Sequence, residues 1–513
     1  MGTIVIGKHT LESLTSGMYS DPFVIYREYI QNSVDSIDKA YQNSLLIPGQ
    51  EQIIVNLQPS EGIISIVDNG LGIKSQCAEH ELMSIGNSKK NVSTDRGFRG
   101  IGRLAALSFC RELIFETSYI GEDIGTKIII NAQQLSDLLS ITNHDSMPIE
   151  DVLNSICTCS IIKANTSDHY FSVTMRGVDN SSPLLNYNLV KDYLEQVAPV
   201  PYNPNIFTWG AEIRARLNQY GYMIPQYNIY LRYGVEKVRI FKPYKDAFLV
   251  DKTRDINDNI VDIEIVELRN DKNLMAVSWV AHSNYIGTIV DKSIKGLRIR
   301  KGNMLIGDGQ TLNTVFKDAR FNGWTLGEVF VLAPDLLPNA RRDHFEKTTT
   351  YFLFAEQMSA IAGDITKKIR SASATRNTEL AMALQKKEIA NDAAKDVLEN
   401  PHIIPQKKSS VVQMMNAAQR DIKKLVPQND VERVIGEIAF DELDMLIGKV
   451  KGATNYKALN TLDKLSKTEK KILEQVFVVL QNQIPAIDAD KAIEAILLHF
   501  TRNGSIKLAT SEK

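Results

Sequence analysis

The sequence predicts an α+β protein in which regions that mix strands and helices are followed by an all-helical region. Apolar residues at three- and four-residue steps predict a helix over residues 26–39, and alternating residues predict a strand in the stretch 64–73 that runs into Asp68. Between residues 227 and 281, four stretches rich in β-branched and aromatic side chains predict further strands. After residue 347 the pattern is helical to the end of the sequence.

Length and breaks in the pattern indicate three domains. The chain has 513 residues, and domains commonly contain about 100–200 residues. A proline-rich stretch at 199–204 indicates the exit from a first domain spanning 1–205. We therefore expect a middle domain over 206–365 and a helical C-terminal domain over 366–513. The helices of the last domain are typical of a small bundle and are a candidate dimer interface.

Composition indicates an ordinary protein of a reducing compartment. A net charge of −2 gives no overall bias toward nucleic acid. The four cysteines make neither a disulfide framework nor a zinc pattern, so we expect a cytoplasmic protein. The sequence contains no apolar run of about 18 residues, which predicts no contact with a membrane.

The predicted helix over 26–39 carries a polar row beside its apolar stripe. Glu28, Asn32 and Asp35 recur at helical steps on one face. A glutamate could polarise a water, and an asparagine one turn away could offer its oxygen to a hard cation such as Mg²⁺. Taken alone, the same row is also typical of a solvated helix face.

In the stretch 64–73, the alternating strand runs directly into Asp68-Asn-Gly70-Leu-Gly72. This arrangement places a carboxylate at the end of a strand, and the glycines let the backbone turn closely around a ligand. The carboxylate of Asp68 could accept a hydrogen bond from an exocyclic amine such as that of adenine. An ordinary glycine turn is the alternative.

A second glycine-rich stretch precedes the helical run 104–110. Gly97, Gly100 and Gly102 free backbone amides near a helix start, where the helix dipole and unpaired N–H groups favour phosphate. The spacing is not the dinucleotide-binding fingerprint, because no strand immediately precedes it.

In this order and at this spacing, the three blocks resemble the GHKL ATPases: gyrase, the ninety-kilodalton heat-shock chaperones, histidine kinases and MutL. The helix over 26–39 is most similar to the first helix of the chaperones. The resemblance implies an N-terminal Bergerat fold, an α/β sandwich with helices on one face of a mostly antiparallel sheet. It also implies ATP and Mg²⁺ as ligands and a homodimer.

The resemblance assigns a role to each matching residue. Glu28 would be the general base, Asn32 would hold Mg²⁺, Asp68 would bind adenine, and the three glycines would contact the phosphates. Asn87 lies where the chaperones usually have a lysine, and Arg103 replaces an aromatic residue. The other expected nucleotide contacts are Asp35, Gly70, Gly72, Ser88, Lys89 and Ile101.

Two further family elements are expected later in the chain. A threonine near adenine is either Thr126 or Thr174, and the sequence does not decide between them. Asn339, Arg342 and Asp343 match the middle-domain signature of the chaperones, in which the arginine reaches the γ-phosphate. A solvated pair of arginines before a helix is the alternative for Arg342.

The resemblance implies a dimeric, ATP-hydrolysing clamp that acts on protein clients. The alternative is a clamp of the MORC or MutL type that acts on DNA, in a defence or genome-maintenance pathway. Basic residues of one predicted strand could then face DNA: Lys295, Arg298, Arg300 and Lys301. Because alternating arginines are also typical of the solvated face of a half-buried strand, nucleic acid is not the favoured partner.

Overall fold

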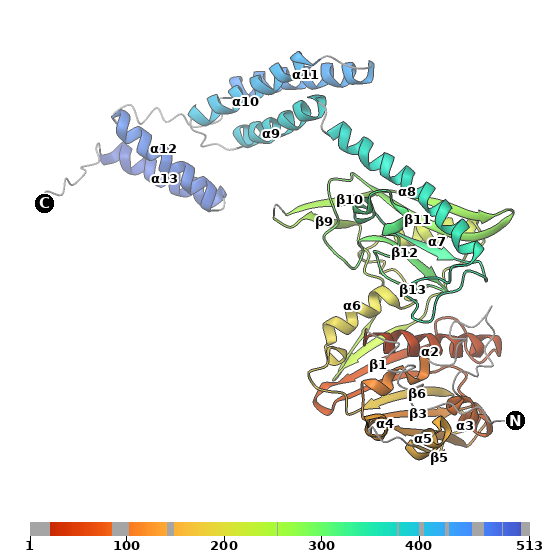
Figure 1. The fold of residues 1–513 in the computed structure, drawn as a ribbon. Coiled ribbons are helices and arrows are strands. Elements are labelled where there is room, and N and C mark those ends of the chain that lie inside the picture. The colour runs from red at the N-terminus through yellow and green to blue at the C-terminus, as the bar shows by residue number, and fades with distance from the viewer. Residues whose placement is uncertain are drawn as a thin grey trace. The chain divides into compact units, whose positions relative to one another are not determined.

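The computed structural model describes residues 21–84, 102–140, 148–253, 255–376, 379–399, 405–425, 430–453, 466–484 and 486–503. The chain forms two compact units, residues 1–370 and 371–513 (Figure 1). The first unit contains two β-sheets with their helices, and the described part of the second is helical. The predicted α+β fold with a helical C-terminal region is therefore confirmed.

The first sheet contains eight strands in the order β5-β4-β3-β6-β2-β1-β7-β8. Neighbouring strands are antiparallel, except that β1 and β7 are parallel. The strands are β1 (Ile53–Gln58), β2 (Ile63–Asp68), β3 (Glu112–Ser118), β4 (Ile124–Asn131), β5 (Cys157–Lys163), β6 (Tyr170–Arg176), β7 (Ile229–Tyr233) and β8 (Glu236–Arg239).

The last two strands of this sheet lie beyond residue 205, where we expected the first domain to end. Helix α7 (Trp209–Gln219) packs in the core of the second region, which is the part of the first unit built around the six-stranded sheet. The chain then returns, and Ile229 of β7 pairs with Ile53 of β1. Ile229 and Leu231 are fully buried in the core of the first sheet. The first sheet is thus completed by a segment that follows part of the second region.

Helix α2 (Val24–Gln42) packs on the first sheet through its apolar stripe. Tyr26, Ile30, Val34 and Ile37 are buried, as the periodicity predicted. Short helices complete this region: η2 (Gly102–Ser108), α3 (Ser75–Met83), α4 (Ala132–Ser140), α5 (Ile149–Ile156) and α6 (Tyr187–Val197) (Figure 1).

The second sheet contains six strands in the order β13-β12-β14-β11-β10-β9. Aromatic side chains from several segments fill its core, with the Trp279 ring 5.2 Å from that of Tyr244. Helix α8 (Thr349–Arg376) follows the sheet. The strands are β9 (Ala247–Asp251), β10 (Ile256–Asn270), β11 (Asn273–Ser283), β12 (Gly296–Lys301), β13 (Met304–Ile306) and β14 (Leu326–Val331).

Strand β12 directs Arg298 and Arg300 into the interior, where their exposed fractions are 2% and 0%. Arg300 donates to Glu328 of β14, which also accepts from Lys242 Nζ at 2.6 Å. Burial acts to raise the pKa of Glu328, but Arg300 and Lys242 together bring it down to about 2. Since β12 lies between two strands and faces this carboxylate, the predictions of a DNA-facing surface and of a solvated face are both wrong for these arginines.

The second unit contains α9 (Glu379–Glu399), α10 (Pro405–Lys424) and α11 (Asp430–Gly452), which share one core. It also contains α12 (Lys467–Gln483) and α13 (Ala486–Asn503). Ser466 and Glu469 form a capping box at the start of α12. Among the described helices, none combines the length and the apolar character that a bilayer crossing requires.

Candidate active site

Helix α2 presents four of its polar side chains toward the interior of the first region. Glu28 is 7% exposed, Gln31 and Asp35 are buried, and Asn32 is half-buried. A buried glutamate is unusual unless it is paired. The predicted polar row is therefore not a solvated helix face.

The partner of Glu28 comes from far along the chain. Nε of Arg342 lies 3.2 Å from Oε1 of Glu28, and another guanidinium nitrogen of Arg342 donates to Oε1 of Gln31. Arg27 Nη2 donates to the backbone carbonyl of Arg341 at 2.7 Å. The side chains of Glu28, Gln31 and Arg27 on α2 thus hold the segment that contains Arg342. The alternative prediction, that Arg342 is solvated, is therefore wrong.

The segment around Arg342 is a tight turn held by its own polar groups. Asn339 Nδ2 donates to Asp343 Oδ1 at 2.6 Å, and the Arg342 N–H donates to the Asn339 carbonyl at 3.1 Å. Arg342 has a φ of 57°, which is uncommon for a residue with a side chain. Its carbonyl accepts from the Gly307 N–H at 2.8 Å. The turn therefore fixes where the guanidinium emerges.

Asp68 ends β2 and is only 2% exposed. Its Oδ1 accepts from the Gly70 N–H at 2.9 Å, while its Oδ2 has no hydrogen-bond partner among the described residues. Burial raises the pKa of Asp68 to about 7, against hydrogen bonds from Ser33, Gly70 and Ser36 that favour the ionised form. An unpaired buried carboxylate oxygen at the end of a strand is an acceptor available to a ligand.

Three of the predicted glycines lie where a side chain would not fit. A Cβ at Gly70 would lie 2.3 Å from Oγ of Ser36. A Cβ at Gly72, which has a φ of +70°, would lie 1.9 Å from the Ser118 carbonyl oxygen. A Cβ at Gly102 would lie 2.1 Å from Oε2 of Glu28. Gly102 begins η2, so the start of this helix directly adjoins the proposed base.

Arg103 follows Gly102 and turns toward helix α3. Its guanidinium donates to the Glu81 carbonyl, and its own carbonyl accepts from the Tyr29 hydroxyl at 2.9 Å. Burial lowers the pKa of Arg103. In the described structure Arg103 thus connects η2 to α3 and α2.

The two candidate threonines lie on different faces of the sheet. Thr126 belongs to a cross-strand row that runs through Thr117 and Phe171 to Asp68, so it shares the face of Asp68. Three strand spacings of about 4.8 Å separate Thr126 from Asp68. Thr174 pairs with Ser65 and therefore lies on the opposite face. The structure places neither threonine beside Asp68.

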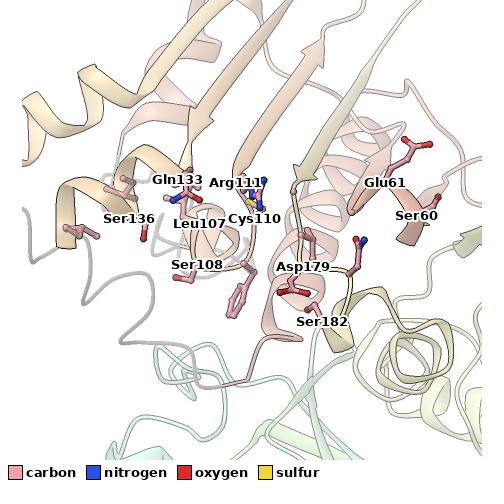
Figure 2. Close-up of a pocket in the computed structure, with 18 residues that line it drawn as sticks. Ser60, Glu61, Leu107, Ser108, Cys110, Arg111, Gln133, Ser136, Asp179 and Ser182 are labelled. Atoms are coloured by element: carbon pink, nitrogen blue, oxygen red, sulfur yellow. The ribbon is translucent and has the colours of Figure 1, made fainter. Parts of the chain in front are cut away.

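A large pocket of about 1020 Å³ lies elsewhere in this region (Figure 2). It is lined by Gly62 just before β2, by Arg111 and Cys110 before β3, and by Asp179 after β6. Asp68 lies at the other end of β2. The pocket of Figure 2 therefore lies away from Asp68, and neither Glu28 nor Arg342 lines it.

Comparison with known proteins decides the family of this region. Residues 19–158 match the family described as histidine kinase-, DNA gyrase B-, and HSP90-like ATPase. This segment is a GHKL ATPase domain. The match contains Glu28, Asn32, Asp68 and the glycine-rich stretch, so the predicted resemblance is confirmed.

Curated relatives match the chain only in part. The chaperone protein HtpG of Geobacter metallireducens is 30% identical over 132 residues, which are 22% of this chain and 20% of that protein. HtpG of Paramagnetospirillum magneticum is 24% identical over 209 residues, covering 35% and 33%. The DNA mismatch repair protein MutL of Lactococcus lactis is 27% identical over 124 residues, covering 23% and 17%. The chain therefore spans a third or less of the length of these relatives.

Some predicted contacts of the GHKL domain lie outside the described residues. These are Asn87, Ser88, Lys89, Gly97, Gly100 and Ile101.

The structure also adds residues that the sequence did not single out. Ser33 and Ser36 lie beside Asp68, His169 Nδ1 lies 2.9 Å from the Gly70 carbonyl, and Gln31 contacts Arg342. Gln31 and Ser33 adjoin Asn32 in the sequence. The sequence does not show that Gln31 contacts Arg342 or that Ser33 lies beside Asp68.

Proposed function

We propose that the chain hydrolyses ATP to ADP and phosphate, with Glu28 as the general base and Arg342 as the arginine that reaches the γ-phosphate. One observation carries this proposal: Arg342, from the second region, lies against the buried Glu28 of the GHKL domain. A buried glutamate can accept a proton from an attacking water. A guanidinium is always charged and presents a fork of donors that suits phosphate oxygens.

The remaining site residues suit the other parts of a nucleotide. The unpaired Oδ2 of Asp68 would accept from the adenine amine, and the closely packed turn at Gly72 would lie against the base. The start of η2 at Gly102 would face the phosphates. Without nucleotide, the ion pair with Arg342 offsets the charge of Glu28.

Magnesium fits this site as an ion held mainly by the nucleotide. No cluster of three or more acidic, histidine or cysteine side chains suited to a metal occurs in the described part of the chain. Mg²⁺ is usually bound by one or two protein oxygens together with substrate phosphates. Asn32 on α2 would supply such an oxygen, and the bound ion would neutralise phosphate charge.

The cycle of binding and hydrolysis would drive a homodimeric clamp that acts on protein clients in the cytoplasm. The similarity to HtpG supports the chaperone role. Ile472, Val476 and Val479 of α12 are 43%, 40% and 58% exposed and lie on one helix face, which supports a dimer contact through the second unit.

The similarity to MutL favours a second candidate, a clamp that acts on DNA. The burial of Arg298 and Arg300 removes the strand that would have supplied its basic surface. Retention on DNA that weakens with salt would favour this second candidate, because phosphate contacts release counterions.

The direct test of the proposed reaction is Glu28→Ala. We expect the variant to bind ATP with Mg²⁺ while its kcat falls by about 10²–10⁴-fold, because general-base catalysis contributes on that order. Glu61→Ala is the matched control, since Glu61 is exposed on the turn between β1 and β2. Wild-type turnover in the Glu28 variant, or an equal loss in the Glu61 variant, would refute the assignment of the base.

A further inference from the structure

Gln31 has no role in the proposed reaction, yet it touches the arginine on which that reaction depends. It lies three residues after Glu28 on α2, so the two side chains project on the same side of the helix. Gln31 is 1% exposed, and its Oε1 accepts from a guanidinium nitrogen of Arg342. Glu28 pairs with a different nitrogen, Nε, of the same guanidinium.

The chemistry of the two groups fixes how the Gln31 carboxamide is turned. A guanidinium carries only donors, so Gln31 must present its oxygen to Arg342 and direct its nitrogen elsewhere. That nitrogen, Nε2, is buried and has no hydrogen-bond partner among the described residues. A buried donor without an acceptor is unfavourable, so an acceptor that arrives at this site is favoured. The oxygens of a phosphate are such acceptors.

Another side chain of α2 holds the same segment in a different way. Arg27 donates to the main-chain carbonyl of Arg341, so it fixes the backbone next to Arg342. Gln31 contacts the guanidinium itself. The carboxamide oxygen is neutral. A carboxylate at this position would carry a full charge and would compete with the phosphate for the guanidinium, whereas the carboxamide holds the guanidinium without that charge.

Resting on the proposed function, we propose that Gln31 is the positioning residue for Arg342. Without nucleotide, Gln31 and Glu28 hold opposite parts of the guanidinium against α2. When the γ-phosphate arrives, the guanidinium turns from Glu28 toward the phosphate while its contact with Gln31 is kept. Glu28 is then released to accept the proton of the attacking water, and Nε2 of Gln31 gains a phosphate oxygen as its acceptor.

The test compares two substitutions of Gln31. Gln31→Met keeps the length and the unbranched shape of the side chain but removes the acceptor. We expect kcat to fall about tenfold, since a hydrogen bond to a charged group is lost, while the KM for ATP changes by less than about threefold. Gln31→Glu keeps an oxygen facing Arg342 but gives it a full charge that competes with the phosphate for the guanidinium, so we expect its kcat also to fall by about tenfold, now with a higher KM for ATP.

A double-mutant cycle shows whether Gln31 acts through Arg342. In an Arg342→Ala background, Gln31→Met should lower kcat by less than about threefold, because no guanidinium remains to be held and only the contact of Nε2 with the phosphate is lost. Hydrogen exchange gives a readout that does not depend on activity. The Arg342 amide, which donates to the Asn339 carbonyl, should exchange faster in Gln31→Met than in wild type.

The outcomes separate the two proposals. ADP binding checks that Gln31→Met is folded, and if binding is lost, Gln31→Asn, which is too short to reach Arg342, takes its place with the same expectations. Equal losses of kcat in both backgrounds, or unchanged exchange at Arg342, would overturn the role of Gln31 and leave the proposed function intact. Full turnover in Arg342→Ala alone would instead overturn the role of Arg342 in the proposed function, and the role of Gln31 with it.

Discussion

The Asp68 carboxyl is costly to keep ionised when no ligand is bound. It is buried at the end of β2, one of its oxygens has no partner among the described residues, and burial raises its pKa to about 7. A carboxyl whose pKa is raised by folding favours the protonated form in the folded state. Its contribution to stability is therefore full below its ordinary pKa of about 4, and is lost as the pH rises through about 7.

Asp68→Asn should therefore change how stability depends on pH. The free energy of unfolding of the variant, relative to that of wild type, should rise from pH 4 to pH 7 and then level off, because asparagine does not ionise. Urea unfolding of the nucleotide-free proteins across this range measures the difference. Asp179→Asn is the control, because hydrogen bonds from Ser181 lower the pKa of the exposed Asp179. A difference that does not vary with pH would show that the fold does not raise the pKa of Asp68.

Individual site residues could be predicted where they belong to a short sequence motif. Asp68, Gly72 and Gly102 follow from local sequence, and the structure places each at a close contact that explains the residue type. Gln31 was not predicted as part of the site, because nothing local distinguishes it from another polar residue on a helix. Its partner Arg342 is distant in the sequence and becomes a neighbour only in the folded chain.

At the scale of elements, β7 pairs with β1, so a chain that ends before β7 lacks part of the first sheet. Ile229 and Leu231 contribute to the core of the first sheet, and β7 covers one edge of β1. An unpaired strand exposes its backbone N–H and C=O groups and favours association with other chains.

A chain that ends after Asn205 should therefore be less stable and more prone to aggregation than one that ends after Lys245. The shorter chain lacks β7 and β8, whereas the longer one keeps the complete first sheet. The thermal midpoint and the fraction of soluble protein compare the two. Equal values for both chains would mean that the two strands contribute little to the fold of the first sheet.

Elements with strong local patterns were predicted well. The predicted apolar stripe of α2 and the predicted strand leading into Asp68 both agree with the structure. The sequence also placed a strand at β7 but could not assign it to a sheet, because a parallel partner is determined by tertiary contacts. The alternating arginines of β12 were predicted to be solvated or to face DNA, and both predictions were wrong for the same reason: the carboxylate they face, Glu328, lies on another strand.

At the scale of the whole molecule, the first unit brings Arg342 of the second region onto α2 of the GHKL domain. Similarity to HtpG and MutL covers at most about a third of the chain, so it identifies the domain and not the role of the whole protein. The contact between Glu28 and Arg342 therefore carries the proposal that both regions act in one reaction.

The measurement that tests this account most directly is the kcat for ATP of Arg342→Ala beside that of Arg341→Ala. Arg341 is exposed and contributes its main-chain carbonyl to Arg27, so its side chain should be dispensable. Arginines that reach the phosphates contribute about 10³–10⁵ in rate in other nucleotide hydrolases, and we expect a loss of at least about 10²-fold for Arg342→Ala. ADP affinity should stay near wild type in both variants. Equal turnover of the two variants would contradict the claim that Arg342 acts on the nucleotide bound by the GHKL domain.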